Sequence, residues 1–313
     1  MNIIFMGTPE FAKPSLEILS RSNHNVVGVF SQPDKPKGRG RILSPSPVKS
    51  FALSQKIPLF QPPDLKDRDV FETIESLSPD IIIVVAFGQL LPKKIIYFPR
   101  LQCVNIHASL LPKYRGAAPI NWALIRGETE TGITTMLMDE KMDTGDILLQ
   151  EKIFITPEDN VMTLHDKLAI LGAEKILDTI EGLESGQITP IKQDHSRASY
   201  APKLKKEDGL INWESSTNDI FNAIRGTFKW PGAYTFFKNH KLKILKVEMP
   251  IKMHAGKPAS VLDVREKGIE VATQDGSLLI TVVQPESKPK MSAYQYTLGH
   301  SIKAGDIFKS DDT

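Results

Sequence analysis

The sequence predicts an α/β protein with a parallel-sheet domain in its N-terminal part and a smaller β-barrel in its C-terminal part. In the first half, short apolar runs alternate with amphipathic segments, which is typical of a parallel sheet covered by helices on both faces. After Gly186 the helical pattern gives way to short alternating runs, which indicate a barrel. The 313 residues suffice for two cores. We therefore expect a Rossmann-like domain followed by a barrel of the oligonucleotide-binding type.

The N-terminal part divides into buried strands and connecting helices. Each expected strand is a short apolar run, and each expected helix carries apolar residues on one face. The clearest helix is Val161–Glu184, where Leu and Ile recur at helical spacing and Gly186 follows as a stop. The expected strands are Asn2–Met6, Asn25–Phe30, Ile81–Ala86, Cys103–Ile106 and Gly132–Met138, and the other expected helices are one that ends near Arg21, Pro47–Lys56, Asp67–Leu77 and Pro119–Arg126.

A polar segment, Gln187–Asp208, separates the two parts and contains prolines and lysines, so it is the best candidate for a linker. We accordingly expect a first domain over residues 1–189, a linker over 190–208 and a second domain over 209–313. The strands expected in the second domain are Ala233–Phe237, Leu242–Val247, Ala259–Val264, Gly268–Thr273 and Leu278–Val283.

Composition narrows the class of protein. No apolar run reaches the ~20 residues that a membrane span needs, so we expect no membrane association. The N-terminus lacks a basic segment and reaches Gly7 at once, which favours a first strand over a signal peptide. A single cysteine, Cys103, excludes an intramolecular disulfide and fits a reducing cytoplasm. The net charge of +2 does not by itself indicate a nucleic-acid binder, although the chain from Gly209 on is the more basic part.

Three polar residues form the candidate catalytic site. Asn105 and His107 close an expected strand, and Asp143 follows a later one. An Asn amide can stabilise a developing oxyanion, a His can move a proton, and a carboxylate beside a His can orient it or carry the proton itself. Cys103 lies in an apolar run, and Ser109 lacks the context of a nucleophile elbow. An acid/base and an oxyanion donor without a nucleophile suit a reaction in which one substrate attacks the other directly.

These three residues also have simpler interpretations. Any one of them alone could simply end a strand or start a turn, and only their combination overturns that interpretation. A metal site is not favoured, because the sequence has no His-x-x-x-His pair and no cysteine ligand set. Gly7-Thr8-Pro9 stands where a dinucleotide-binding fingerprint would begin, but Pro9 replaces its second glycine.

Two clusters of cations are candidates for contact with a nucleic-acid backbone. The first is a long loop, 32–41, in which Lys and Arg alternate with Gly and Pro, and the second lies in the expected linker. Such side chains can reach phosphates, although a solvated loop and a solvated tether are the alternatives. The residues are Lys35, Lys37, Arg39 and Arg41 in the loop, and Lys203, Lys205 and Lys206 in the linker.

These motifs together resemble the formyltransferases that use 10-formyltetrahydrofolate. The run SLLPKYRGAAPINWA from Ser109 and the segment Met142–Gly145 are similar to those of the broad folate group, as is Asn105-x-His107. A more specific resemblance, to the methionyl-tRNA formyltransferase family, rests on motifs spread over nearly the whole chain. They are FMGTPEFA at Phe5–Ala12, SQPDKPKGRG at Ser31–Gly40, SPSPVK at Ser44–Lys49 and WPGAY at Trp230–Tyr234.

The resemblance implies formyl transfer from 10-formyltetrahydrofolate to the α-amino group of methionine on initiator tRNA, for translation initiation. It implies that Asn105 and His107 stabilise the tetrahedral oxyanion, and that Asp143 orients His107 and helps move the proton from the amine to N10 of the folate. It also implies tRNA contacts from the basic loop and the C-terminal domain. The implied folate-binding residues are Phe87, Gly88, Gln89, Leu90, Ser109, Leu110, Leu111 and Pro112.

We expect a cytoplasmic monomer that needs no metal. Two alternatives remain open from the sequence. One is an enzyme of the same folate group that formylates a small amine, and the other is a non-enzymatic RNA-binding protein on a decayed scaffold. The intact Asn105, His107 and Asp143 argue against decay.

Overall fold

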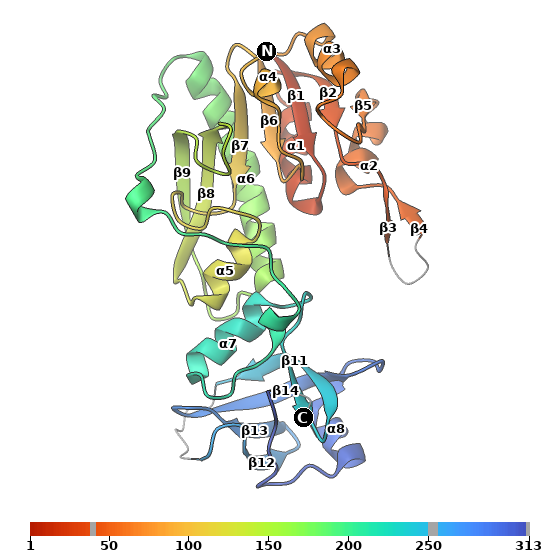
Figure 1. The fold of residues 1–313 in the computed structure, drawn as a ribbon, viewed down its shortest axis with the longest axis vertical. Coiled ribbons are helices and arrows are strands. Elements are labelled where there is room, and N and C mark those ends of the chain that lie inside the picture. The colour runs from red at the N-terminus through yellow and green to blue at the C-terminus, as the bar shows by residue number, and fades with distance from the viewer. Residues whose placement is uncertain (38–41, 250–255, 311–313) are drawn as a thin grey trace. The chain divides into compact units, whose positions relative to one another are not determined.

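The computed structural model describes residues 1–37, 42–249 and 256–310, and its chain forms two compact units (Figure 1). The first unit comprises Met1–Pro119, Glu130–Phe154 and Leu164–Ala201. The second comprises Ile120–Thr129, Ile155–Thr163 and the chain from Pro202 on. Two short segments of the N-terminal half therefore belong to the second unit. The domain bounds 1–189, 190–208 and 209–313 stay a prediction.

The first unit is built on a seven-stranded sheet with the order β5-β2-β1-β6-β7-β8-β9. The first five strands in this order are parallel, which confirms the expected parallel sheet, whereas β7, β8 and β9 pair antiparallel. The strands are β1 (Asn2–Gly7), β2 (Asn25–Phe30), β5 (Leu59–Phe60), β6 (Ile81–Val85), β7 (Cys103–His107), β8 (Glu130–Leu137) and β9 (Ile147–Phe154).

The antiparallel direction of β8 follows from its connection to β7. His107 at the end of β7 pairs with Thr134 in the middle of β8, so the chain re-enters the sheet near the place where it left. A parallel return would need a crossover along the whole strand, and the only helix in between, α5 (Pro119–Ile125), has seven residues. The neighbouring edge strand β9 was not predicted, because its alternating exposed residues leave no apolar run.

The helices of the first unit begin and end where local chemistry favours it. The Ser46 hydroxyl accepts a hydrogen bond from the Lys49 N–H (3.0 Å), and Pro47 occupies the first turn of α2. Helix α6 buries Leu164, Leu168 and Ile176 on one side. The helices are α1 (Lys13–Ser20), α2 (Pro47–Ser54), α3 (Arg68–Ser76), α4 (Lys93–Ile96) and α6 (Val161–Glu184), with a 3-10 turn η1 (Glu10–Ala12) before α1 and η2 (His195–Arg197) after α6.

The basic loop differs from the sequence-based expectation. Its flanks form a two-stranded antiparallel hairpin of β3 (Lys35–Lys37) and β4 (Ile42–Ser44). An ion pair between Lys49 and Asp34 (2.7 Å) ties the base of this hairpin to α2. Arg39 and Arg41 lie outside the described residues.

The second unit contains the expected barrel, and all five predicted strands are present. The C-terminal segment joins the two edges of the sheet, because the Val261 N–H donates to Asp306 O (2.7 Å) and the Phe236 N–H donates to Lys309 O (3.0 Å). The sheet order is β10 (Tyr234–Phe237), β11 (His240–Glu248), β14 (Ser277–Pro285), β13 (Gly268–Ala272) and β12 (Val261–Arg265), with β15 (Met291–Ser292) paired to β14.

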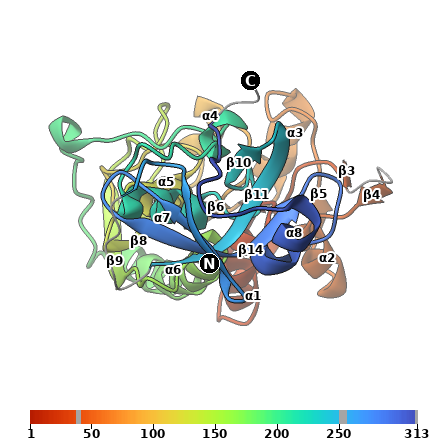
Figure 2. The same cartoon turned by 90° about the horizontal axis from the view of Figure 1, so that it is seen from below.

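Helices also contribute to the second unit. Helix α7 (Thr217–Gly226) contacts β11 and β14, and α8 (Ala293–His300) packs beside β12, β13 and β14 (Figure 2). A short turn η3 (Glu207–Gly209) precedes α7. Among the described helices, none is long and apolar enough for a membrane crossing.

An aromatic cluster lies in the barrel core and includes the closing segment. Phe308 is 1% exposed, and its ring lies 6.0 Å from that of Trp213 and 5.6 Å from that of Phe237, measured between centroids. The Trp213 indole N–H donates to the Thr235 hydroxyl (3.0 Å), so the indole is satisfied inside the core. The closing segment is therefore held by side-chain burial as well as by backbone hydrogen bonds.

Replacing Phe308 by Ala should lower the free energy of unfolding of the second unit by about 3–5 kcal/mol, because the change leaves a cavity in the barrel core. Urea denaturation followed by tryptophan fluorescence measures the loss. The matched control is Ile307→Ala, since Ile307 is the adjacent residue and is 46% exposed. Equal unfolding midpoints for the two variants would contradict the role given to the closing segment.

Candidate active site

Asn105 and His107 lie two residues apart on β7, so their side chains point to the same face of the sheet. Asn105 is 9% exposed and His107 is 6% exposed. Within the described parts of the chain, the Asn105 amide makes no hydrogen bond. A nearly buried amide without an intramolecular partner is available to a bound substrate.

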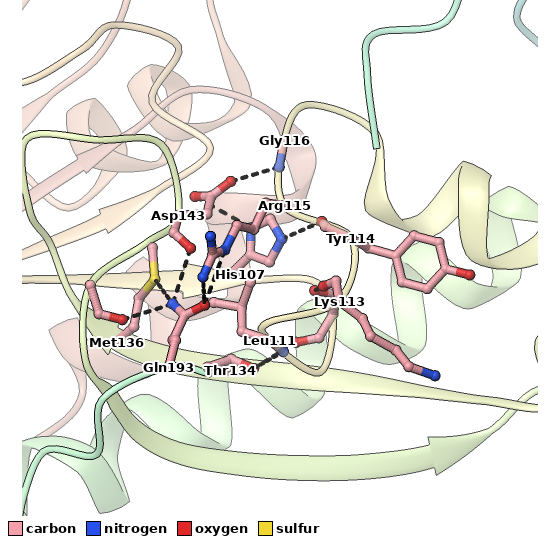
Figure 3. A network of polar contacts seen from close by, with 12 residues as sticks. His107, Leu111, Lys113, Tyr114, Arg115, Gly116, Thr134, Met136, Asp143 and Gln193 are labelled. Carbon is pink, nitrogen blue, oxygen red and sulfur yellow. Dashed lines mark hydrogen bonds and ion pairs between the residues drawn. The ribbon is translucent and has the colours of Figure 1, made fainter. Parts of the chain in front are cut away.

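The protonation of His107 is set by its neighbours (Figure 3). Its Nε2 lies 2.9 Å from the Tyr114 carbonyl oxygen. A carbonyl can only accept, so Nε2 carries a proton. Its Nδ1 lies 3.7 Å from Asp143 Oδ1, a distance that fits an ion pair rather than a hydrogen bond. Nδ1 is therefore the ring nitrogen that can gain or lose a proton.

Asp143 contacts both His107 and Gly116, and it lies in a constrained turn. Its backbone is left-handed (φ 55°), and its Oδ2 accepts a hydrogen bond from the Gly116 N–H (2.8 Å). A Cβ at Gly116 would lie 2.7 Å from the Ala201 carbonyl oxygen, so only glycine lets the chain approach this closely. The carboxylate thus lies between His107 and the loop that follows the SLLP motif.

The path of the chain to Asp143 differs from what we expected. In an all-parallel sheet, the loop after the expected strand Gly132–Met138 would leave at the carboxyl ends of the strands, the same edge as His107. Because β8 runs antiparallel, its last residue, Leu137, instead pairs with Val104 near the start of β7. The loop between β8 and β9 nevertheless brings Asp143 to His107.

Two further buried residues, Gln193 and Arg115, belong to this network. Gln193 Nε2 donates to the carbonyl oxygens of Asp143 (3.0 Å) and Gly145 (2.7 Å), and Gln193 Oε1 accepts from Arg115 Nε (3.1 Å) and Nη2 (2.6 Å) (Figure 3). Sequence reasoning missed Gln193, because it lies in the polar segment expected as a linker and no motif marks it. Arg115 is part of the SLLPKYRG run, but the sequence indicated no role for this residue.

The side chain of Thr134 on β8 holds the loop that carries Ser109–Pro112. The Thr134 hydroxyl donates to Ser109 O (2.7 Å) and accepts from the Leu111 N–H (3.0 Å). Gln150 donates to Leu111 O (2.8 Å). The Ser109 hydroxyl donates to Lys113 O (2.7 Å), so it closes the turn of its own loop.

The segment Phe87–Leu90 follows β6, the strand next to β7. The Thr8 hydroxyl donates to Phe87 O (3.0 Å), and Gly88 is left-handed (φ 88°). The Gln89 side chain accepts from the Leu65 N–H (3.2 Å), whereas Leu90 is exposed. The two segments expected to bind folate thus leave neighbouring strands at the same edge of the sheet.

The expected tRNA-binding lysines are exposed where the structure describes their side chains. Lys35 is exposed on β3, and Lys203, Lys205 and Lys206 are exposed in the second unit. The side chain of Lys37, like all of Arg39 and Arg41, lies outside the described part.

A further lysine of the second unit lies close to Lys206. Burial lowers the pKa of Lys241, and the charges of Lys243 and Lys206 lower it further, whereas the Glu286 carboxylate raises it. Lys241 Nζ also lies 3.5 Å from the centroid of the Tyr234 ring. Lys206, Lys241 and Lys243 form a cluster of lysines that also has Glu286 nearby.

Cys103 is fully buried, and burial raises the pKa of its thiol well above the usual range. Its Sγ lies 3.5 Å from Ile95 O. A protonated, inaccessible thiol cannot act as a nucleophile. Over residues 1–37, 42–249 and 256–310, no group of three His, Cys, Asp or Glu side chains could hold a metal ion.

Family profiles match both parts of the chain. The profile described as Formyl transferase matches residues 1–180, and the profile described as Formyl transferase, C-terminal domain, matches residues 203–301. The methionyl-tRNA formyltransferase of Trichlorobacter lovleyi is 49% identical over 97% of this chain and 96% of that protein. The enzyme of the same name from Syntrophus aciditrophicus is 48% identical over 98% of each chain.

A solved structure shares the fold. It is that of HypX from Aquifex aeolicus in complex with tetrahydrofolic acid, with a TM-score of 0.65 and 20% identity. The match covers 94% of this chain, which spans about half of the HypX chain (46%).

Cys103 should not react with thiol reagents at pH 8 in the native protein, because its thiol is both buried and protonated. A colorimetric thiol assay should give no signal before urea is added and one thiol per chain afterwards. Rapid labelling of the native protein with loss of activity would show instead that the thiol is accessible and close to the site.

Proposed function

The chain belongs to the methionyl-tRNA formyltransferase family, and we propose that Asn105, His107 and Asp143 carry out its reaction. The enzyme transfers a formyl group to the α-amino group of methionine on tRNA, which gives the N-formylmethionyl-tRNA of translation initiation. The assignment of the residues depends on one observation: an Asn amide without an intramolecular partner lies two residues from a histidine that faces a carboxylate.

The formyl donor in this proposal is 10-formyltetrahydrofolate, which presents its formyl group on N10. The amine nitrogen of methionine forms a bond to the formyl carbon, the bond from that carbon to N10 breaks, and one proton passes from the amine to N10. Negative charge develops on the formyl oxygen in between. The Asn105 N–H donates a hydrogen bond to that oxygen and is most useful when the charge is largest.

His107 and Asp143 manage the proton. Because the Tyr114 carbonyl keeps a proton on Nε2, only Nδ1 changes its protonation. A proton on Nδ1 gives the ring a positive charge beside the developing oxyanion, and the Asp143 carboxylate 3.7 Å away stabilises that charge. Asp143 is also the base that accepts the proton of the attacking amine in this proposal.

The folate is proposed to lie along Phe87–Leu90 and Ser109–Pro112. The polar side chains of Gln89 and Ser109 are used within the protein, so these segments offer backbone groups and apolar side chains instead. That combination suits a flat pterin ring, whose edges carry donors and acceptors and whose faces are apolar. Leu90, which is exposed, is available for such a contact.

The tRNA is proposed to contact the basic residues Lys35, Lys37, Arg39 and Arg41, together with Lys203, Lys205 and Lys206. The exposure of the described lysines among them and the cluster of Lys206 with Lys241 and Lys243 support this assignment. An enzyme for a small amine would have no use for the exposed lysines of the loop and the linker, and a binding protein would have no use for the paired His107 and Asp143. We expect the enzyme to act as a monomer in the cytoplasm.

Asn105→Ala should lower turnover by about 10²–10³, as the loss of an oxyanion donor does. Asp143→Asn should lower it by about 10²–10⁴, since an acid/base group is lost. Single-turnover formylation of charged initiator tRNA measures both rates, and circular dichroism checks that the variants fold. Asn25→Ala, at an exposed position at the amino end of β2, is the control. Near-normal turnover of folded Asn105→Ala or Asp143→Asn would sink the proposed site.

Lys205→Ala and Lys206→Ala should each weaken tRNA binding and flatten the log–log dependence of affinity on salt by about 0.7–0.9, because each removes one phosphate contact. Folate affinity should stay unchanged. Fluorescence titration with tRNA at several salt concentrations measures the slope, and exposed Lys56→Ala is the matched control. Equal losses of tRNA and folate affinity would assign these lysines a structural role.

A further inference from the structure

The segment that carries Gln193 is fixed at both ends within the first unit. At one end, Ile191 exchanges two hydrogen bonds of 2.8 Å with Ile147, the first residue of β9. At the other end, the Arg115 N–H donates to Ser199 O (2.9 Å), and the Ala201 N–H donates to Arg115 O (2.7 Å). The segment therefore links the end of the Asp143 loop to the loop that contains Gly116.

Gln193 uses both ends of its side-chain amide. Its two N–H bonds go to carbonyl oxygens on either side of Thr144, those of Asp143 and Gly145. Its oxygen accepts two N–H bonds from the Arg115 guanidinium. An arginine cannot accept a hydrogen bond, so Arg115 fixes which end of the amide faces the Asp143 loop. Gln193 is 6% exposed, and water does not compete effectively for these bonds.

The side chain of Arg115 hydrogen-bonds to neutral groups. It is 3% exposed, and its remaining side-chain contact is with His195 Nδ1 (3.0 Å), a neutral acceptor in that contact. Among the described residues, no carboxylate lies within ion-pair distance of its guanidinium. A buried cation that is bonded to neutral groups is costly, and this one is used to hold Gln193.

Gln193 is bonded to a turn in which the backbone conformation of Asp143 is unfavourable. A left-handed backbone is unfavourable for a residue with a side chain, and such conformations persist where the surroundings hold them. The two carbonyl bonds from Gln193 fix the backbone on both sides of Thr144. The aim of the Asp143 carboxylate at His107 and Gly116 depends on that backbone.

We propose that Gln193 is a positioning residue for formyl transfer, held in place by Arg115, and that it acts on the reaction through Asp143. The inference rests on the role of Asp143 in the proposed function. Gln193 donates to the backbone of the turn and its amide is fully used, so it contributes to the alignment of the carboxylate rather than to substrate binding.

The substitution Gln193→Glu removes the donor end of the side chain and keeps the acceptor end. A glutamate still accepts from Arg115, but it cannot donate to the carbonyl oxygens of Asp143 and Gly145. We expect kcat to fall by about 10–10², the loss that a small misplacement of a catalytic group causes, with the KM values for folate and tRNA nearly unchanged. Gln55→Glu makes the same change at an exposed position and should leave kcat and both KM values unchanged.

The deciding experiment combines Gln193→Glu with Asp143→Asn in single-turnover assays. If Gln193 acts through Asp143, Gln193→Glu should change the rate of Asp143→Asn by no more than about a factor of two. The same loss in both backgrounds, or no loss in either, overturns the inference. A fully active Asp143→Asn variant would instead refute the proposed function. If Gln193→Glu does not fold, Gln193→Asn, whose amide is too short to reach both partners, takes its place in the same cycle, with the same outcomes expected.

Discussion

The contact between His107 Nδ1 and Asp143 Oδ1 is the interaction on which the rest of the site depends. His107 is fixed from the strand side, because β7 is buried and the Tyr114 carbonyl holds the other ring nitrogen. Asp143 is fixed from the loop side, by the Gly116 N–H and by a turn that its own backbone disfavours. A rigid strand therefore supplies one partner and a strained loop supplies the other, and the accuracy of the site depends on the loop.

The sheet topology explains why this loop needs support. Since β8 runs antiparallel to β7, the loop before β9 begins beside Val104 and must reach His107, three residues further along the strand. Because this loop begins away from His107, no strand end directs Asp143 toward the histidine. The segment after α6 supplies the missing support, because it hydrogen-bonds to β9 at Ile191 and to Arg115 near the SLLP motif.

Local signals made much of the fold and site predictable. Asn105 and His107 could be recognised because they close an expected strand and the SLLPKYRG run follows them, and the barrel strands because apolar and polar residues alternate. Gln193 could not, because its contacts are with residues 50 and 78 positions away and its neighbours in sequence are polar. The edge strand β9 and the β3–β4 hairpin were not predicted for a related reason. Their pairing partners, rather than their own residues, make them strands.

The closure of the barrel by its C-terminal segment has a consequence for the order in which the chain folds during synthesis. All seven strands of the large sheet of the first unit have left the ribosome once Phe154 has emerged, whereas the barrel lacks one side until Asp306–Lys309 is made. Residues 120–129 and 155–163 belong to the second unit and are made long before their barrel partners. The nascent chain thus carries a complete catalytic sheet for some time beside an open barrel edge, a state in which chaperones are useful.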